Sequence, residues 1–315
     1  NAALALATGD FAVLCDHDDI LPPEALFSFA EAIVKEPETD CLYSDEDKLD
    51  MDGGSLFDPH FKPDFNPDLL GSVNYICHLF AVRKSLLDTV GQFDAAYDGA
   101  QDYDFIFRVT EKARHIVHVP KVLYHWRCHM NSTASNPESK LYAFEAGARA
   151  IRAHYERVYP ELKIKEVKKG VDYGIYHTIF DLTEEPLISV VIPNKDHRED
   201  LDKAMRSLLE QGTYKNLEFI VVENNSTDPE TFDYYEAIQK ELSQVRVVYY
   251  KGGFNFSAIN NFGVSYAKGE YLLFMNNDVE LINPDTMREL LGYGMRRDVG
   301  AVGCRLLYED DTIQH

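Results

Sequence analysis

The sequence is short of basic residues, and this shortage argues against partners that are polyanions. Only 31 lysines and arginines stand against 53 acidic residues, which gives a formal net charge of −22. A protein of that charge repels phosphate backbones and anionic membrane surfaces, so we expect no nucleic-acid partner. Long hydrophobic runs are also lacking, since no window approaches the roughly 20 apolar residues that a spanning helix requires. We therefore expect a soluble chain.

Cysteine pairs are lacking as well. The five cysteines are widely spaced, and no two of them form a CxxC motif. This pattern favours reduced thiols over a disulfide or zinc framework. The first ten residues carry neither the basic segment nor the cleavage pattern of a secretory signal. Together these observations predict a cytoplasmic location.

An internal repeat is present, and it divides the chain in an unusual way. An offset of 260 residues places residues 16–18 (DHD) on residues 276–278 (NND), each after a glycine and an apolar strand. Since the chain has 315 residues, this offset leaves 55 duplicated positions, too few for a whole domain. The chain therefore resembles the back of one unit followed by the front of another.

Short apolar segments alternate with helical patterns after residue 185, which predicts an α/β fold with a parallel sheet. The predicted strands are 187–192, 218–222, 245–250 and 271–275, and the predicted helices are 201–209 and 257–267. Parallel sheets bind ligands beyond the carboxyl ends of their strands. Polar clusters at 193–196, 223–226 and 276–278 fall at such ends. Before this segment we predict a helix over 141–158 and a charged connector.

Two acidic segments in the first part of the chain need an interpretation. Residues 16–19 (DHDD) follow the predicted strand 11–15 directly, which favours a site for Mg²⁺ or Mn²⁺ at a strand end. An aspartate-rich turn that caps the next helix is the alternative. Residues 44–48 (SDEDK), with the turn up to Gly54, fail the calcium-loop pattern because Pro59 stands where the closing glutamate belongs. For this segment we predict a solvated turn.

Several ordered motifs carry a resemblance to a known family. ISVVIPNKD, VVENNSTD, GEYLLFMNND and GDFAVLCDHDD resemble the nucleotide-sugar-binding half of family 2 glycosyltransferases of the GT-A fold. SDEDK, FKPDF, GAQDYDF and VLYHWRCHMNSTA resemble the acceptor-side half, particularly in two-domain bacterial enzymes that build surface polysaccharides. The resemblance implies a GT-A-like, Rossmann-like, mostly parallel sheet flanked by helices, in two partial copies. These are residues 1–155 and 186–315, joined by a connector over 156–185.

The resemblance also implies site residues in the first copy. Asp18 would hold the metal on the donor diphosphate, and Asp16 would lie beside it, near the ribose. His125, in preference to His129, would complete the metal shell. Asp102 matches the base that deprotonates the acceptor hydroxyl, although this chain has Gln101 where family members usually have glutamate. The alternative makes Asp102 an ordinary acid at a helix N-terminus.

In the second copy the resemblance assigns positions to the donor's base and ribose. They are Pro193, Asn194, Asp196, Glu223 and Asp228. Asn276 replaces the first acid of the metal motif there, which leaves Asp278 as its metal-type carboxylate.

The reaction implied is metal-dependent, inverting transfer of a sugar from a nucleotide-sugar donor to a glycan or lipid-linked glycan, with Mn²⁺ or Mg²⁺. The split of the two copies leaves open a dimer through exchanged half-domains, a permuted domain within one chain, or two separately folded fragments. For the longer protein, the resemblance implies association with membrane-bound glycan machinery at the inner face of the membrane. Two alternatives stay open. One is a non-catalytic module that binds nucleotide sugars or glycans. The other is a metal-independent hydrolase that uses Asp16 or Asp18 with Asp102.

Overall fold

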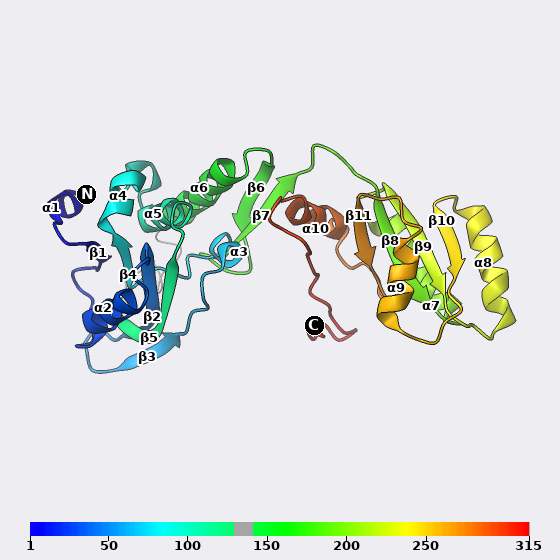
Figure 1. Ribbon diagram of the computed structural model, residues 1–315, viewed down its shortest axis with the longest axis horizontal. Helices are drawn as coiled ribbons and strands as arrows, with labels where there is room; N and C mark the ends of the chain where they lie inside the picture. The colour runs from blue at the N-terminus through cyan, green and yellow to red at the C-terminus, as the bar shows by residue number, and fades with distance from the viewer. Residues whose placement is uncertain (129–140, 315) are drawn as a thin grey trace. The chain divides into compact units, whose positions relative to one another are not determined.

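The computed structural model describes residues 1–128 and 141–314, and its contacts divide the chain into two compact units. The first unit is Asn1–Ile179 and the second is Phe180–His315 (Figure 1). Both units combine helices with β-sheet, so the predicted α/β class is confirmed.

The first unit is built around one mixed sheet. Strand β1 pairs antiparallel with β4, β4 pairs antiparallel with β2, and β2 pairs parallel with β5 and antiparallel with β3. The sheet in this unit is therefore mostly antiparallel, in contrast to the second unit. The strands are β1 Phe11–Leu14, β2 Cys41–Leu49, β3 Leu56–His60, β4 Phe80–Arg83 and β5 Ile116–Arg127. The helices are α1 Ala2–Leu6, α2 Ala25–Lys35, α3 Pro67–Leu70, α4 Lys84–Val90, α5 Gln101–Thr110 and α6 Leu141–Val158.

Strand β2 corrects the prediction of a solvated turn at residues 44–48. Those residues form the middle of a nine-residue strand, and Asp45, Glu46 and Asp47 are all buried. A buried carboxylate is tolerated when it is paired and hydrogen-bonded. Each of the three has such a partner on another segment, as described below. The exposed turn begins only after the strand, where Gly54 N donates to Asp50 Oδ1 at 2.8 Å.

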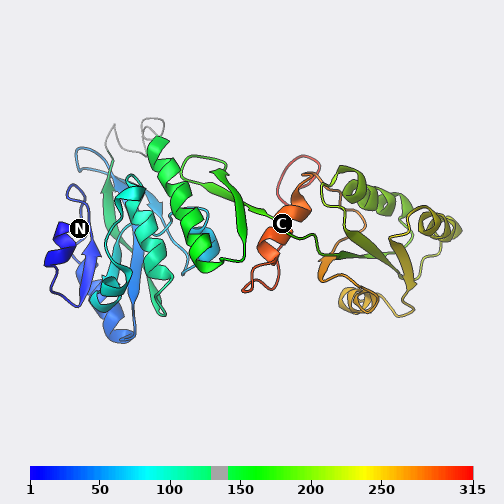
Figure 2. The same ribbon diagram turned by 90° about the horizontal axis from the view of Figure 1, so that it is seen from above.

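The segment expected to be a connector is folded. Strands β6 Lys163–Lys169 and β7 Tyr176–Asp181 form a two-stranded sheet, which follows helix α6 (Figure 2). The close approach of β7 to α6 needs a glycine, because a Cβ on Gly147 would lie 2.1 Å from Tyr176 Oη. That hydroxyl donates to Phe144 O at 3.1 Å. The end of the first unit therefore lies at Ile179 rather than near residue 155.

The second unit contains a four-stranded parallel sheet in the order β10-β9-β8-β11. Val191, Val222 and Ile259 bury one face under helix α9, and a larger apolar cluster buries the opposite face under α7 and α8 (Figure 2). The strands are β8 Ile188–Asn194, β9 Leu217–Glu223, β10 Val245–Tyr249 and β11 Tyr271–Phe274. The helices are α7 Arg198–Arg206, α8 Pro229–Glu241, α9 Phe256–Val264 and α10 Thr286–Gly294.

The sequence repeat coincides with strands β1 and β11. The offset of 260 residues places Phe11–Leu14 on Tyr271–Phe274, residue for residue. Strand β1 pairs with an antiparallel neighbour, β4, whereas β11 pairs with a parallel neighbour, β8. Both strands stand at an end of their sheet within the described residues. The repeated strand therefore has an antiparallel neighbour in the first unit and a parallel neighbour in the second.

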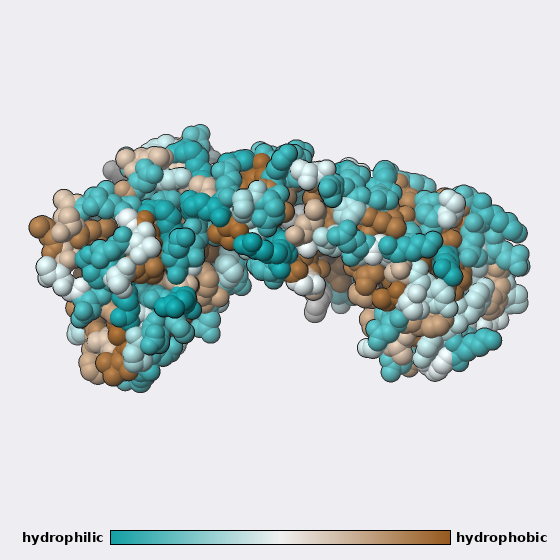
Figure 3. All heavy atoms as spheres, turned by 45° about the horizontal axis from the view of Figure 1, so that its top comes forward, coloured by the Kyte–Doolittle hydropathy of each residue, from teal (hydrophilic) through white to brown (hydrophobic). Residues whose placement is uncertain are grey.

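One face of the protein is mainly hydrophilic. On the face drawn in Figure 3, hydrophilic residues predominate and hydrophobic residues form small patches. Across the described ranges, no helix is both long enough and apolar enough to span a bilayer.

We predict that Gly147→Ala destabilises the first unit by about 1–3 kcal/mol, because the added methyl group displaces Tyr176. Urea unfolding followed by circular dichroism measures the change. Combining Gly147→Ala with Tyr176→Phe should restore part of the loss. Gly294→Ala is the matched control, since an added Cβ there has only Val302 nearby, at 3.9 Å. Equal stability of Gly147→Ala and the wild type would contradict the packing of β7 on α6.

Candidate active site

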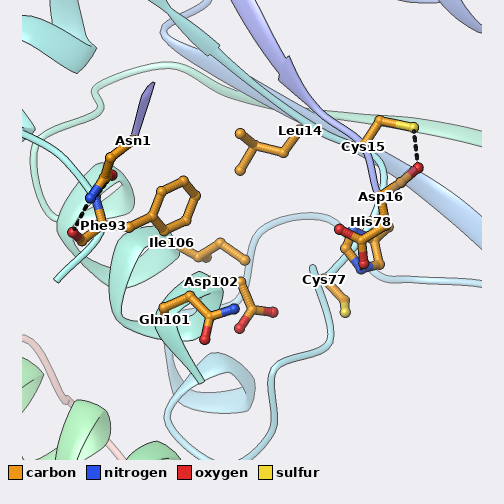
Figure 4. A pocket seen from close by; sticks show the side chains of 10 residues that line it. All are labelled: Asn1, Leu14, Cys15, Asp16, Cys77, His78, Phe93, Gln101, Asp102 and Ile106. Carbon is orange, nitrogen blue, oxygen red and sulfur yellow. Dashed lines mark hydrogen bonds and ion pairs between the residues drawn. The ribbon is translucent and has the colours of Figure 1, made fainter. Parts of the chain in front are cut away.

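A cavity of about 340 Å³ opens in the first unit beyond the end of strand β1 (Figure 4). This volume lies within the range of ligand pockets in proteins. Its walls come from the end of β1, the loop that precedes β4 and the first turns of α5. The lining residues are Asn1, Leu14, Cys15, Asp16, Cys77, His78, Phe93, Gln101, Asp102 and Ile106. The fold thus brings Asp16 and Asp102, which are 86 positions apart in the sequence, to one cavity.

Asp102 lies in the first turn of α5, as the helix-terminus interpretation requires, and it also faces the cavity. Asn74 Nδ2 donates to Asp102 Oδ2 at 3.1 Å. Burial raises the pKa of Asp102, and the negative charge of Asp16 adds to the rise, while His78 acts in the opposite direction. A carboxylate with a raised pKa accepts a proton more readily than an ordinary aspartate. Gln101 Oε1 accepts a hydrogen bond from Gly99 N at 2.8 Å.

The acidic segment after β1 is held by strand β5. Asp16 N donates to Tyr124 Oη at 3.2 Å, and Asp19 Oδ1 accepts from Arg127 N at 2.7 Å. Arg127 Nε also donates to Asp18 O at 2.8 Å. The side chain of Asp16 is 64% exposed, so it is open to a ligand. Helix α2 begins only at Ala25, so these acids do not cap it.

His125 is oriented by an acid of β2. It lies within strand β5, opposite Asp47, and its Nδ1 is 2.5 Å from Asp47 Oδ1. Such a contact fixes an imidazole ring and leaves Nε2 as its coordinating atom. Within residues 1–128 and 141–314, no three His, Cys, Asp or Glu side chains form a ready metal-binding group. His125 is therefore not gathered with Asp16 and Asp18, and His129 lies outside the described residues.

The sequence did not single out His78, which the structure places in the cavity beside Asp16. Its Nε2 lies 4.0 Å from Asp16 Oδ2, and its ring stacks on Tyr124 with centroids 4.7 Å apart. Among the described residues its buried Nδ1 has no hydrogen-bond partner. The available signal was one imidazole within the apolar run 75–82. Such a histidine usually belongs to the core, so this signal was weak.

In the second unit, the predicted donor-side residues form a hydrogen-bonded group at the carboxyl ends of β8 and β9. Asn194 Nδ2 donates to Tyr235 Oη at 2.7 Å, and that hydroxyl donates to Glu223 Oε2 at 2.7 Å. Asn277 Nδ2 donates to Asn194 Oδ1 at 2.7 Å. Glu223 also accepts from Ser226 N and Oγ, both at 2.5 Å. Glu223 is therefore already engaged in holding its own loop.

The other donor-side residues also shape this edge of the sheet. Asp196 Oδ1 accepts from Thr227 N at 2.7 Å and from Asp228 N at 2.9 Å. These hydrogen bonds hold the pKa of Asp196 below its usual range. Asp228 pairs with Arg198 at 2.7 Å. Pro193 lies in β8 next to Asn194, while Asp278 is exposed after β11.

A parallel sheet with polar side chains at the carboxyl ends of its strands defines the class of α/β proteins that bind nucleotides and related ligands there. Comparison with known proteins makes the class specific. Residues 189–314 match the family described as glycosyl transferase family 2. This match confirms the resemblance to family 2 glycosyltransferases over residues 189–314.

The chain is also similar to individual proteins. The chain is 39% identical to an uncharacterized protein, y4gI, of Sinorhizobium fredii, and 38% identical to the O-antigen biosynthesis protein RfbC of Myxococcus xanthus. Both matches cover 100% of this chain but only 34% and 24% of those proteins. A solved mannosyltransferase of Pyrobaculum calidifontis, in complex with GDP-Man and Mn²⁺, is 20% identical with a TM-score of 0.37. That match covers 41% of this chain and 38% of the mannosyltransferase.

We predict that Asp102→Asn is at least as stable as the wild type at neutral pH. The pKa of Asp102 is raised in the folded state, so the free energy of unfolding falls as the pH rises from the ordinary pKa of aspartate to the raised value. Above the raised value the penalty for the buried charge is complete. Below the ordinary pKa of aspartate the penalty is absent, so the advantage of the variant should vanish in acid. Thermal unfolding of both proteins between pH 4 and pH 8 measures this difference. A variant that is less stable at pH 8 than at pH 4, relative to the wild type, would contradict the burial of this charge.

Proposed function

We propose that the protein transfers a sugar from a nucleotide-sugar donor to a growing glycan during synthesis of bacterial cell-surface polysaccharide. The single observation that carries the proposal is the cavity in which Asp102 from α5 and Asp16 from the end of β1 both present carboxylates. The match to family 2 supports the reaction class. The O-antigen biosynthesis protein among the relatives supports the kind of product.

Asp102 is the proposed base. An acceptor hydroxyl oxygen attacks the anomeric carbon while the bond from that carbon to the diphosphate oxygen breaks. The carboxylate of Asp102 accepts the hydroxyl proton, and a single displacement inverts the anomeric carbon. Asn74 holds Asp102 Oδ2, which leaves Oδ1 as the oxygen for the proton. Placing a base in this way is worth about 10²–10⁴-fold in rate.

Asp16 and Asp18 are the proposed ligands of Mn²⁺ or Mg²⁺. One or two carboxylates are enough for such an ion when the substrate's phosphates complete the oxygen shell, so the absence of a three-ligand group in the described residues does not oppose the proposal. His125, which the resemblance offered as a further ligand, is held by Asp47 apart from these two acids, so the proposal does not need it. When bound, the ion neutralises charge on the departing nucleoside diphosphate.

The two units are proposed to be the acceptor half of one glycosyltransferase domain and the donor half of the next. The support is the repeat of β1 as β11 and the opposite directions of the strands that pair with them. A sheet that contained both kinds of neighbour would place a parallel strand on one side of this element and an antiparallel strand on the other. In the donor half, Asn194, Asp196 and Asp228 are proposed to face the nucleoside, with Glu223 shaping their loop.

A non-catalytic binding module is the second candidate. Two departures from the family pattern favour it, namely Gln101 before the proposed base and Asn276 in place of the first metal-motif acid of the second copy. Gln101 lines the cavity and accepts a hydrogen bond from Gly99 N, but its side chain is an amide, so it adds no second carboxylate there. The fate of the donor distinguishes the candidates. Transfer requires an acceptor, hydrolysis requires only water, and a binding module releases no nucleoside diphosphate.

Calorimetry of the chain with a panel of UDP-, GDP- and dTDP-sugars, with and without Mn²⁺, tests donor binding. We predict that Asp18→Ala abolishes the Mn²⁺-dependent part of the affinity, because the diphosphate loses the ion that neutralises it. Asp278→Ala, at the equivalent position of the repeat, shows whether the second copy also binds the ion. Asp88→Ala, which removes an exposed acid of α4, should change nothing. Unaltered Mn²⁺ dependence in Asp18→Ala would overturn the metal site.

Release of nucleoside diphosphate in the presence of a glycan acceptor tests the reaction. We predict that Asp102→Asn lowers the transfer rate by about 10²–10⁴-fold and leaves donor affinity intact, because the base acts on the acceptor. A collapse of donor affinity would instead identify Asp102 as a donor-side or structural residue.

A further inference from the structure

A lysine with a fully buried side chain binds the loop that contributes Cys77 and His78 to the cavity of the first unit. The side chain of Lys62 is 0% exposed, and its Nζ lies 3.3 Å from Glu46 Oε2. The same Nζ donates to Ile76 O at 2.7 Å and to His78 O. All three hydrogens of the ammonium group thus have acceptors, two of which are backbone carbonyls of one loop.

Glu46 completes this arrangement from strand β2. Its Oε2 accepts from His78 N at 3.3 Å, and its Oε1 lies 3.5 Å from His60 Nδ1. Burial alone raises the pKa of Glu46, but His60 and Lys62 outweigh it and hold the pKa below its usual range. Glu46 is therefore a carboxylate that binds the backbone of the same loop as Lys62.

The loop that the pair holds carries His78, which lines the cavity, and Asn74, which contacts the cavity residue Asp102. Asn74 donates to Asp102 Oδ2 and accepts from Cys77 N at 3.3 Å, so its amide is fixed on both sides. His78 is the residue whose backbone N–H and carbonyl bind Glu46 and Lys62, and its ring faces Asp16. Neither Lys62 nor Glu46 lines the cavity itself.

We propose that Lys62 and Glu46 are positioning residues for sugar transfer: they clamp residues 74–78 so that Asn74 orients Asp102 and His78 stands beside Asp16. This inference rests on the proposed function and deepens it. A buried ion pair often gives no more stability than apolar residues of similar size. The carbonyl and N–H contacts to the loop are what apolar residues cannot replace. The pair therefore acts on geometry more than on stability.

Four variants separate geometry from stability. Lys62→Met and Glu46→Leu each leave one buried charge without its ion-pair partner, which is strongly destabilising. The double variant removes both charges and should recover part of the melting temperature. Lys48→Met is the matched control, because Lys48 lies on the same strand as Glu46 and pairs with Asp58 of β3, but is partly exposed. If a single variant does not fold, Glu46→Gln, which retains the shape of the side chain, takes its place.

Two readouts are needed, and one does not depend on activity. Steady-state kinetics gives kcat and the donor KM. The side-chain amide signal of Asn74, assigned by its loss in Asn74→Ala, is followed by NMR of ¹⁵N-labelled protein. We expect Lys62→Met and the double variant to shift this signal and to lower kcat by up to about a hundredfold, with donor KM unchanged. Lys48→Met should alter neither readout.

Recovery of kcat together with the melting temperature in the double variant would overturn the proposal, because a merely structural pair behaves in that way. An Asn74 signal that stays in place in Lys62→Met would overturn it as well. If the wild type transfers no sugar to any acceptor, the proposed function fails. In that case the NMR signal of Asn74 alone shows whether Lys62 and Glu46 hold residues 74–78 in place.

Discussion

Three consecutive buried carboxylates on strand β2 impose the constraint on which the cavity of the first unit depends. A buried charge without a partner is strongly destabilising, so Asp45–Asp47 require partners from other segments. Asp45 lies 2.9 Å from His118 Nε2, and Asp47 binds His125, so β5 is held along its length. Glu46 takes Lys62 from the segment after β3 and thereby reaches the loop that contributes Cys77 and His78 to the cavity. One strand thus connects the sheet, the buried lysine and the site.

Strands β1 and β11, at the ends of their sheets, share a sequence pattern but pair with neighbouring strands in different directions. Strands β1 and β11 coincide in the repeat, yet one pairs antiparallel with β4 and the other parallel with β8. Backbone hydrogen bonding is available on both edges of any strand, so the strand does not select its neighbour by itself. The neighbours are selected by the helices and apolar side chains that pack on each sheet. This difference supports the proposal that the two units are complementary halves of one type of domain.

The site residues that the resemblance predicted have different surroundings in the structure. Local sequence places Asp16 after a strand and Asp102 at a helix start, and the fold of the first unit brings the two acids to one cavity. His125, predicted as a metal ligand, is paired with Asp47. Glu223, expected at the ribose, is occupied by its own loop and by Tyr235. An acid in a sequence motif can either stabilise its own loop or bind the ligand. Its hydrogen-bond partners in the structure show which of the two roles it has.

The sequence by itself determined the α/β class, the strands of the second unit, the helix Leu141–Val158, the repeat and the family. These features rest on local periodicity and on contiguous motifs, which need no knowledge of distant neighbours. Tertiary structure alone decided that residues 44–48 are buried, that β6 and β7 replace a connector, and that His78 lines the cavity. Each of those outcomes depends on partners far along the chain, such as Lys62 for Glu46 and Tyr176 for Gly147. Charge pairing and close packing leave no periodic trace in a sequence, so three-dimensional contacts were required to find them.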